Sequence, residues 1–224
     1  RHAANDPDVH VSRWLAGGAP AGVSLMPELA GIFPPVSMVP SYEIQPTTFT
    51  DDLDDYSSVE DDDDAVGEIR KLANTDYIDA FYDIAELICA VNGDPVVSKL
   101  ALIKKLQDDK VDIRLILDCL QSGVNAMTWQ LERILLPAVL DVVNDSLDLM
   151  AACLDGETVE YLVLDYTDAF YKFPLRPDER KFFTAYFDGM FLNWNRIAQG
   201  SKNDPQLFGR LSAMISRLTQ GVFD

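Results

Sequence analysis

A run of acidic residues separates two parts of this chain that differ in character. Residues 51–64 contain nine acids and no basic residue, and they supply almost half of the net charge of −19. Such a block repels itself and does not fold around an apolar core. Gly and Pro recur through residues 17–48, where they interrupt helix and strand patterns alike. We therefore expect residues 1–67 to be an extended, mostly disordered lead-in, with one short helical turn over residues 10–16.

The composition excludes several classes of protein. At 224 residues the chain is long enough for one domain with a core of its own. It has no run of the ~20 apolar residues that a membrane span needs, so we expect no membrane partner. The two histidines lie near the start and the cysteines lie far apart, so neither predicts a metal site. We expect Cys89, Cys119 and Cys153 to be buried thiols of a protein in a reducing, intracellular compartment, cytoplasmic or nuclear.

After residue 67 the sequence becomes periodic and predicts three helices. Apolar residues from Ile78 to Val91 fall at helical spacing, and the Asn-Gly pair that follows ends this helix. We therefore assign residues 68–94 to a helical segment. Pro137 fits the first turn of a second helix, and Pro205 opens a third.

Two hairpins and one strand complete the predicted fold. Residues 96–105 and 111–118 are rich in β-formers and are separated by an Asp-Asp turn. Asp188-Gly189 is a second hairpin signal between two apolar runs. Residues 161–165 predict a short buried strand that ends in a carboxylate. The predicted fold class is α+β, with a mainly antiparallel sheet and packed helices.

Single polar residues in these elements have ordinary explanations. An acid at a strand end, such as Asp165, more often caps the following helix than performs chemistry. Gly200 can simply supply a turn with positive φ. Arg114 alternates with apolar neighbours and fits a solvent-facing strand position. Lys105 and its neighbour Lys104 fit a solvated surface pair.

The order and spacing of several segments are more specific than any single residue. These segments are RLILD at 114–118, VLDYTDAF at 163–170, PL at 174–175, KFFTA at 181–185 and QGSKNDPQLF at 199–208. Together they resemble the reverse transcriptase domain of retroviral and LTR-retrotransposon polyproteins, over residues 95–224. The resemblance implies a right-hand polymerase fold, with a fingers-like hairpin at 95–130 and an incomplete palm at 131–224.

The resemblance also implies an activity and its metal site. An RNA-directed DNA polymerase joins a dNTP to a primer 3′-hydroxyl on an RNA or DNA template by two-metal nucleotidyl transfer. By resemblance, Asp165 is the catalytic carboxylate that binds Mg²⁺, and the backbone carbonyl of Tyr166 is a further ligand. Arg114 and Lys105 correspond to fingers cations that bind the triphosphate.

Further nucleotide contacts follow from the same resemblance. Asp168 and Ala169 match residues that lie under the triphosphate. Phe170 matches the bulky ring that excludes a ribose 2′-hydroxyl by steric clash. Gln199, with Gly200 beside it, matches the residue that lines the pocket for the nucleotide 3′-hydroxyl.

Two departures separate the chain from this family. Asn203-Asp204 stands where the family most often has Ser before Pro, and it adds a negative charge near the nucleotide pocket. The Tyr-x-Asp-Asp hairpin, which carries the other two metal-binding aspartates, occurs nowhere in the sequence. One carboxylate does not hold two Mg²⁺ ions against their hydration. The chain begins with Arg rather than Met, so we expect a piece of a longer protein; it shows no secretory leader. Because the Tyr-x-Asp-Asp motif is missing, we expect this piece not to polymerise by itself.

Two other hypotheses stay open. One is a degenerate relic of such a gene that folds partially and has no activity. The other is an interaction module whose acidic tract, residues 51–64, binds a basic partner while the palm-like part serves as a scaffold. The ordinary interpretation of such a tract is a solvated spacer.

Overall fold

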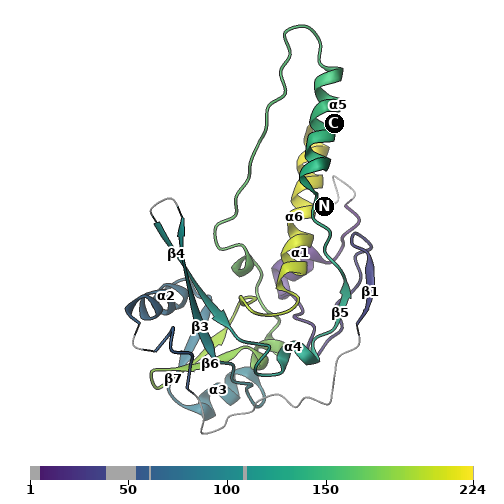
Figure 1. Cartoon of the computed structure of the whole chain (residues 1–224). Coiled ribbons are helices and arrows are strands. Elements are labelled where there is room, and N and C mark those ends of the chain that lie inside the picture. The colour runs from purple at the N-terminus through teal and green to yellow at the C-terminus, as the bar shows by residue number, and fades with distance from the viewer. Residues whose placement is uncertain (1–5, 39–53, 61, 108–109, 224) are drawn as a thin grey trace.

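Three small sheets, each with antiparallel strand pairs, form the framework of the molecule (Figure 1). The computed structural model describes residues 6–38, 54–60, 62–107 and 110–223. Among these residues the strand orders are β1–β5, β2–β7–β6 and β3–β4. Helices pack around the sheets, so the predicted α+β class is confirmed. The division into fingers-like and palm-like parts stays a prediction.

The central sheet is built on the hairpin predicted at Asp188-Gly189. β6 (Thr184–Phe187) and β7 (Met190–Trp194) pair across this turn, and both turn residues have positive φ. The first strand is shorter than predicted, because a 3₁₀ helix, η2 (Pro177–Phe182), precedes it.

The other edge of β7 pairs with a strand that the sequence did not predict. This strand is β2 (Ile78–Phe81), and helix α3 (Ile84–Val91) begins only after its N-cap, Asp83. The prediction of one helix from Ile78 to Val91 is therefore wrong over its first part. Apolar residues with period near 3.6 also fit a strand followed by a turn when the run is this short.

The second predicted hairpin is also confirmed. β3 (Leu100–Gln107) and β4 (Lys110–Leu117) pair along their whole length, with Lys105 opposite Asp112 and Ile103 opposite Arg114. Figure 1 shows this hairpin projecting beyond the central sheet. After β4 the chain forms a short helix, α4 (Val124–Met127).

Part of the acidic run begins a helix instead of remaining extended. Helix α2 (Asp63–Asn74) is capped by Asp62, whose carboxylate accepts a hydrogen bond from the N–H of Asp64. Carboxylates are favourable at this end of a helix. Lys104 on β3 forms ion pairs with Asp62 at 2.8 Å and with Asp64 at 2.7 Å, which join α2 to the hairpin.

The prediction of a disordered lead-in is wrong for residues 6–38, which pack on the body of the molecule. The expected helical turn is present as α1 (Val11–Gly17), with Val11 and Trp14 buried. β1 (Pro35–Met38) pairs with β5 (Gln130–Glu132).

A buried carboxylate satisfies the backbone of this irregular segment. Glu179 is fully buried and accepts hydrogen bonds from the backbone N–H groups of residues 21–25. These groups have no helix or strand partner, and burying them unpaired is costly. A single side chain, 154 or more residues away along the chain, thus replaces regular secondary structure.

The N-terminal segment is also joined to the last helix, α6 (Asp204–Phe223), which begins near the predicted Pro205. Arg210 and Asp8 are both buried and form two hydrogen bonds, of 2.7 and 2.8 Å. The guanidinium also donates to the carbonyl of Glu28 and lies 4.1 Å from the ring centroid of Trp14. A buried ion pair is stable only when its hydrogen bonds are made, as they are here.

The segment between β5 and the central hairpin departs most from the predicted fold. Helix α5 (Val139–Ala152) follows Pro137 as predicted, but none of its residues is buried. Figure 1 shows α5 standing away from the sheets, and a long loop leading back from it. The buried strand predicted at residues 161–165 is wrong: these residues form an exposed loop, in which Val163 is 86% exposed.

Two composition-based expectations can be compared with the structure. Cys119 is buried as expected, but Cys89 is exposed and Cys153 is half-buried. The expectation of three buried thiols is therefore wrong. Within the part of the chain that the structure describes, no helix has the length and apolar character needed to cross a membrane.

Replacing Arg210 with Met should destabilise the fold strongly. The Met side chain keeps much of the volume but leaves the Asp8 carboxylate buried and unpaired. We expect the free energy of unfolding, measured by urea titration, to fall by about 3–5 kcal/mol. The control is Asp178→Asn, which breaks the exposed ion pair with Arg176 and should cost less than about 1 kcal/mol. Equal losses in the two variants would show that the buried pair is dispensable.

Candidate functional site

One cavity brings together most of the residues predicted to form a site. It has a volume of about 860 Å³ and is lined by parts of α2, β4, the loop that precedes η1 (Phe170–Lys172), and the loop that precedes α6. The predicted residues that line it are Arg114, Asp165, Tyr166, Asp168, Ala169, Phe170 and Gln199. Of the predicted set, Lys105 and Gly200 do not line it.

Aromatic side chains attach the loop that follows Asp165 to the core. The rings of Tyr166 and Phe170 contact Phe208 of α6 edge-on, with centroids 5.4 and 6.1 Å apart. Tyr171 is buried and stacks on Tyr77 at 4.9 Å. The loop is therefore held by these rings, while Asp165 itself is exposed at the mouth of the cavity rather than at the end of a strand.

Two ion pairs lie on the α2 and β4 walls of the cavity. Arg114 Nη2 is 2.8 Å from Asp112 Oδ2, and Lys71 Nζ is 3.0 Å from Glu68 Oε1. Partial burial acts to lower the pKa of Lys71, but the Glu68 carboxylate, with help from Asp168, raises it overall. Lys71 is thus charged at neutral pH.

The cavity as a whole has an acidic lining. Its ionisable carboxylates are Glu68, Asp112, Asp165 and Asp168, against the two cations Lys71 and Arg114. Among the described residues, Asp165 and Asp168 have no ion-pair partner. A strongly anionic ligand is therefore attracted by Lys71 and Arg114 and repelled by Asp165 and Asp168, which line the same cavity.

The oxygen atoms of Asp165 and Tyr166 are of the type that Mg²⁺ prefers. Two ions, however, need several carboxylate oxygens. In residues 6–38, 54–60, 62–107 and 110–223 no three or more His, Cys, Asp or Glu side chains converge as a metal-binding group. Asp165 and Tyr166 alone supply too few carboxylate oxygens for two ions, and Mg²⁺ stays a prediction.

Gly200 has a structural role that brings Gln199 to the cavity. Its φ is +124°, and a Cβ at this position would overlap the carbonyl oxygen of Leu117 at the end of β4. The N–H of Leu117 donates to the carbonyl of Gln199 at 2.8 Å, and the side-chain amide of Asn125 donates to the carbonyl of Gly200 at 3.0 Å. The close approach that only glycine allows thus joins the Gln199 loop to β4.

Asp204, the departure from the family pattern, is a buried carboxyl beneath the same loop. It is 1% exposed, and neither side-chain oxygen has a hydrogen-bond partner among the described residues. Burial raises the pKa of Asp204 well above its ordinary value, although the nearby hydroxyl and N–H of Ser201 act to lower it. Burial therefore favours the neutral, protonated form of Asp204, whereas the sequence led us to expect a negative charge here.

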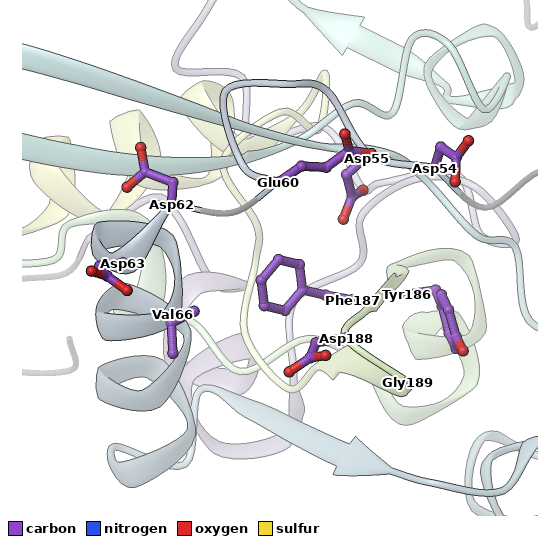
Figure 2. A pocket seen from close by; sticks show the side chains of 10 residues that line it. All are labelled: Asp54, Asp55, Glu60, Asp62, Asp63, Val66, Tyr186, Phe187, Asp188 and Gly189. Atoms are coloured by element: carbon purple, nitrogen blue, oxygen red, sulfur yellow. The ribbon is translucent and has the colours of Figure 1, made fainter.

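A second cavity, of about 570 Å³, is lined by the acidic tract (Figure 2). Figure 2 shows the ring of Phe187 among carboxylates of this tract. Burial raises the pKa of Asp55 to about 6, although the N–H of Leu100 donates to this carboxylate at 2.7 Å and lowers the value. Ser58 accepts from the N–H of Leu102 on the same strand. The described part of the tract is thus attached to β3 rather than being a solvated spacer.

Lys71 and Glu68 are cavity residues that the sequence did not single out. Their spacing of three residues on an exposed helix face is common to any stabilised surface helix. Only the packing of α2 beside β4 gives this pair a place in the cavity, and nothing in the local sequence predicts that packing.

Comparison with known proteins adds no family assignment. No protein-family model matches the chain, and no curated protein is significantly similar to it. The likeness to reverse transcriptases therefore rests on the residues themselves.

Replacing Gly200 with Ala should destabilise the loop that carries Gln199. Both the positive φ and the overlap with Leu117 oppose a Cβ at this position. We therefore expect the free energy of unfolding, measured by thermal or urea denaturation, to fall by about 1–3 kcal/mol. Gly67→Ala is the matched control: it lies within α2 with open space around it, and should gain about 0.5–1 kcal/mol. A neutral Gly200→Ala would argue against the close approach to β4.

Replacing Asp204 with Asn should change how stability depends on pH. The folded-state pKa of Asp204 lies above its ordinary value of 3.8, so the folded chain keeps a proton that the unfolded chain releases. This stabilisation is complete below pH 3.8 and is lost as pH rises toward the folded-state pKa. The loss is at most about 1.4 kcal/mol per pH unit. Asn has no such proton, so the variant should gain stability relative to wild type as pH rises from 3.8 toward the folded-state pKa of Asp204.

The control for this experiment is Asp178→Asn. Arg176 holds the pKa of Asp178 below its ordinary value, so this carboxylate stays charged over the whole range. Its difference from wild type should not vary with pH. An equally flat difference for Asp204→Asn would contradict the argument from burial.

Proposed function

We propose that this chain is part of an RNA-directed DNA polymerase of the reverse transcriptase type, and that the larger cavity binds a dNTP. The supporting observation is that three segments far apart in the sequence, at Arg114, residues 165–170 and Gln199, line one cavity. The family pattern assigns all three to a single nucleotide site. A chance similarity of motifs gives no reason for them to meet in space.

The proposed roles agree with the chemistry of the lining. Arg114 offers a planar guanidinium on one wall, which suits a phosphate. Phe170 lines the cavity and is held edge-on against Phe208, so its ring is a fixed steric barrier there. Gln199 is half-buried and supplies an amide for a sugar hydroxyl. In this proposal, Asp165 provides a carboxylate for Mg²⁺ where the primer end would react.

The sequence does not include the Tyr-x-Asp-Asp motif that completes the metal site of this family. Nucleotidyl transfer therefore requires carboxylates from outside residues 1–224, whereas nucleotide binding does not. The relic hypothesis differs at this point, since a degenerate cavity has no reason to discriminate among nucleotides.

A primer-extension assay tests the function. The chain alone should be inactive, and a longer product of the same gene that includes the missing motif should extend a primer on an RNA template. In that longer protein Asp165→Asn should abolish extension while leaving the circular dichroism spectrum unchanged. Asp148→Asn, in exposed helix α5, is the matched control and should retain activity. Normal extension by Asp165→Asn would remove this residue from the metal site.

The role of Phe170 is tested by substrate selectivity in the same longer protein. Phe170→Ala should raise the ratio of ribonucleotide to deoxyribonucleotide incorporation by about tenfold or more, because it removes the barrier to a 2′-hydroxyl. A ratio equal to that of wild type, with dNTP incorporation retained, would assign Phe170 to packing alone.

A further inference from the structure

The second cation of the cavity comes from a part of the chain that no motif identified. Lys71 belongs to α2, upstream of the segment that resembles reverse transcriptases. Together with Arg114 it makes up the basic lining of the cavity among the described residues. The two cations come from elements in contact with each other, α2 and β4, and line the same cavity.

Both cations are accessible, and each has one carboxylate partner within the described part of the chain. The side chains of Lys71 and Arg114 are 53% and 54% exposed. Lys71 Nζ is 3.0 Å from Glu68 Oε1, and Arg114 Nη2 is 2.8 Å from Asp112 Oδ2. The Arg114–Asp112 pair is exposed on both sides and contributes little to stability, so a stronger anion can replace Asp112 at small cost. The Glu68 side chain is 14% exposed, so an anion that replaces it must bind Lys71 more strongly.

Lys105, the cation that the sequence favoured, is placed differently. It lies directly opposite Asp112 in the β3–β4 register but does not line the cavity. Lys105 is therefore paired with a residue of the cavity lining across the hairpin, but is not part of the lining itself. The alternative is that Lys105, rather than Lys71, is the second cation. A variant of Lys105 tests it, because Lys105 has the same charge as Lys71 and is similarly exposed.

We propose that Lys71 and Arg114 together bind the polyphosphate of a nucleotide, and that Glu68 and Asp112 are internal competitors which the phosphate displaces. The nucleotide part of this inference rests on the proposed function. A polyphosphate has several charged oxygens and so can contact both cations, because the two line one cavity. Arg114 offers a two-point contact and Lys71 a point charge. Since the rest of the lining is acidic, the ligand binds as its magnesium complex.

The inference is tested by calorimetric titration of the full chain at fixed ionic strength with Mg²⁺ present. The ligands are dATP, inorganic tripolyphosphate and deoxyadenosine. Lys71→Gln should weaken binding of dATP and of tripolyphosphate about tenfold, the effect of losing one charge-assisted contact. Glu68→Gln should strengthen both, because it removes the competitor of Lys71. Lys105→Gln should change either affinity less than about twofold, which is typical of a screened charge outside the site. Deoxyadenosine binding should not respond to any of the three.

The outcomes separate this inference from the proposed function. If tripolyphosphate follows the expected order of variants while primer extension by the longer protein fails, the inference stands and the polymerase proposal does not. If dATP binding depends on Lys105 but not on Lys71, the inference is overturned and the polymerase proposal stands. Weaker binding by Glu68→Gln, or no binding of either phosphate ligand by wild type, also overturns it.

Discussion

Buried carboxylates that accept hydrogen bonds from distant groups are the interaction on which the rest of this structure depends. Glu179 binds the backbone of residues 21–25, and Glu132 accepts from the N–H groups of Ala30 and Gly31. Asp8 holds Arg210 of the last helix. Because residues 6–38 contain little regular structure, their polar backbone needs such partners in order to be buried. These contacts join the first part of the chain to α6, and α6 in turn supports the loop that follows Asp165 through Phe208.

The same dependence on close, specific contacts extends to the cavity. Gly200 allows the Gln199 loop to meet the end of β4, and Gln199, β4 and the loop at Asp165–Phe170 all contribute to the lining. Helix α2, which also contributes to the lining, is joined to the hairpin by Lys104. The cavity thus has a packed frame, whereas its two cations are more than half exposed. This combination suits binding of a charged ligand better than it suits a role in stability.

Local signals in the sequence were sufficient for the hairpins and for the start of α6, because turn residues and proline act within a few positions. They failed where a partner far along the chain decides the outcome. Residues 161–165 have the apolar pattern of a buried strand but pair with no strand among the described residues. The local pattern at Ile78–Phe81 predicts a helix, because the strand that pairs with β2, β7, lies more than 100 residues away. Lys71 was missed for the same reason. Residues around Asp165 and Gln199 were found because a family pattern, rather than local propensity, linked them.

The central claim is that the larger cavity, and not the acidic one beside the tract, is the nucleotide site. The most direct measurement is a backbone NMR titration of the isotope-labelled chain with dATP and Mg²⁺. The account predicts shift changes concentrated at Lys71, Arg114, residues 165–171 and Gln199. Changes confined to residues 54–63 and 186–189, or the absence of any saturable change, would contradict it.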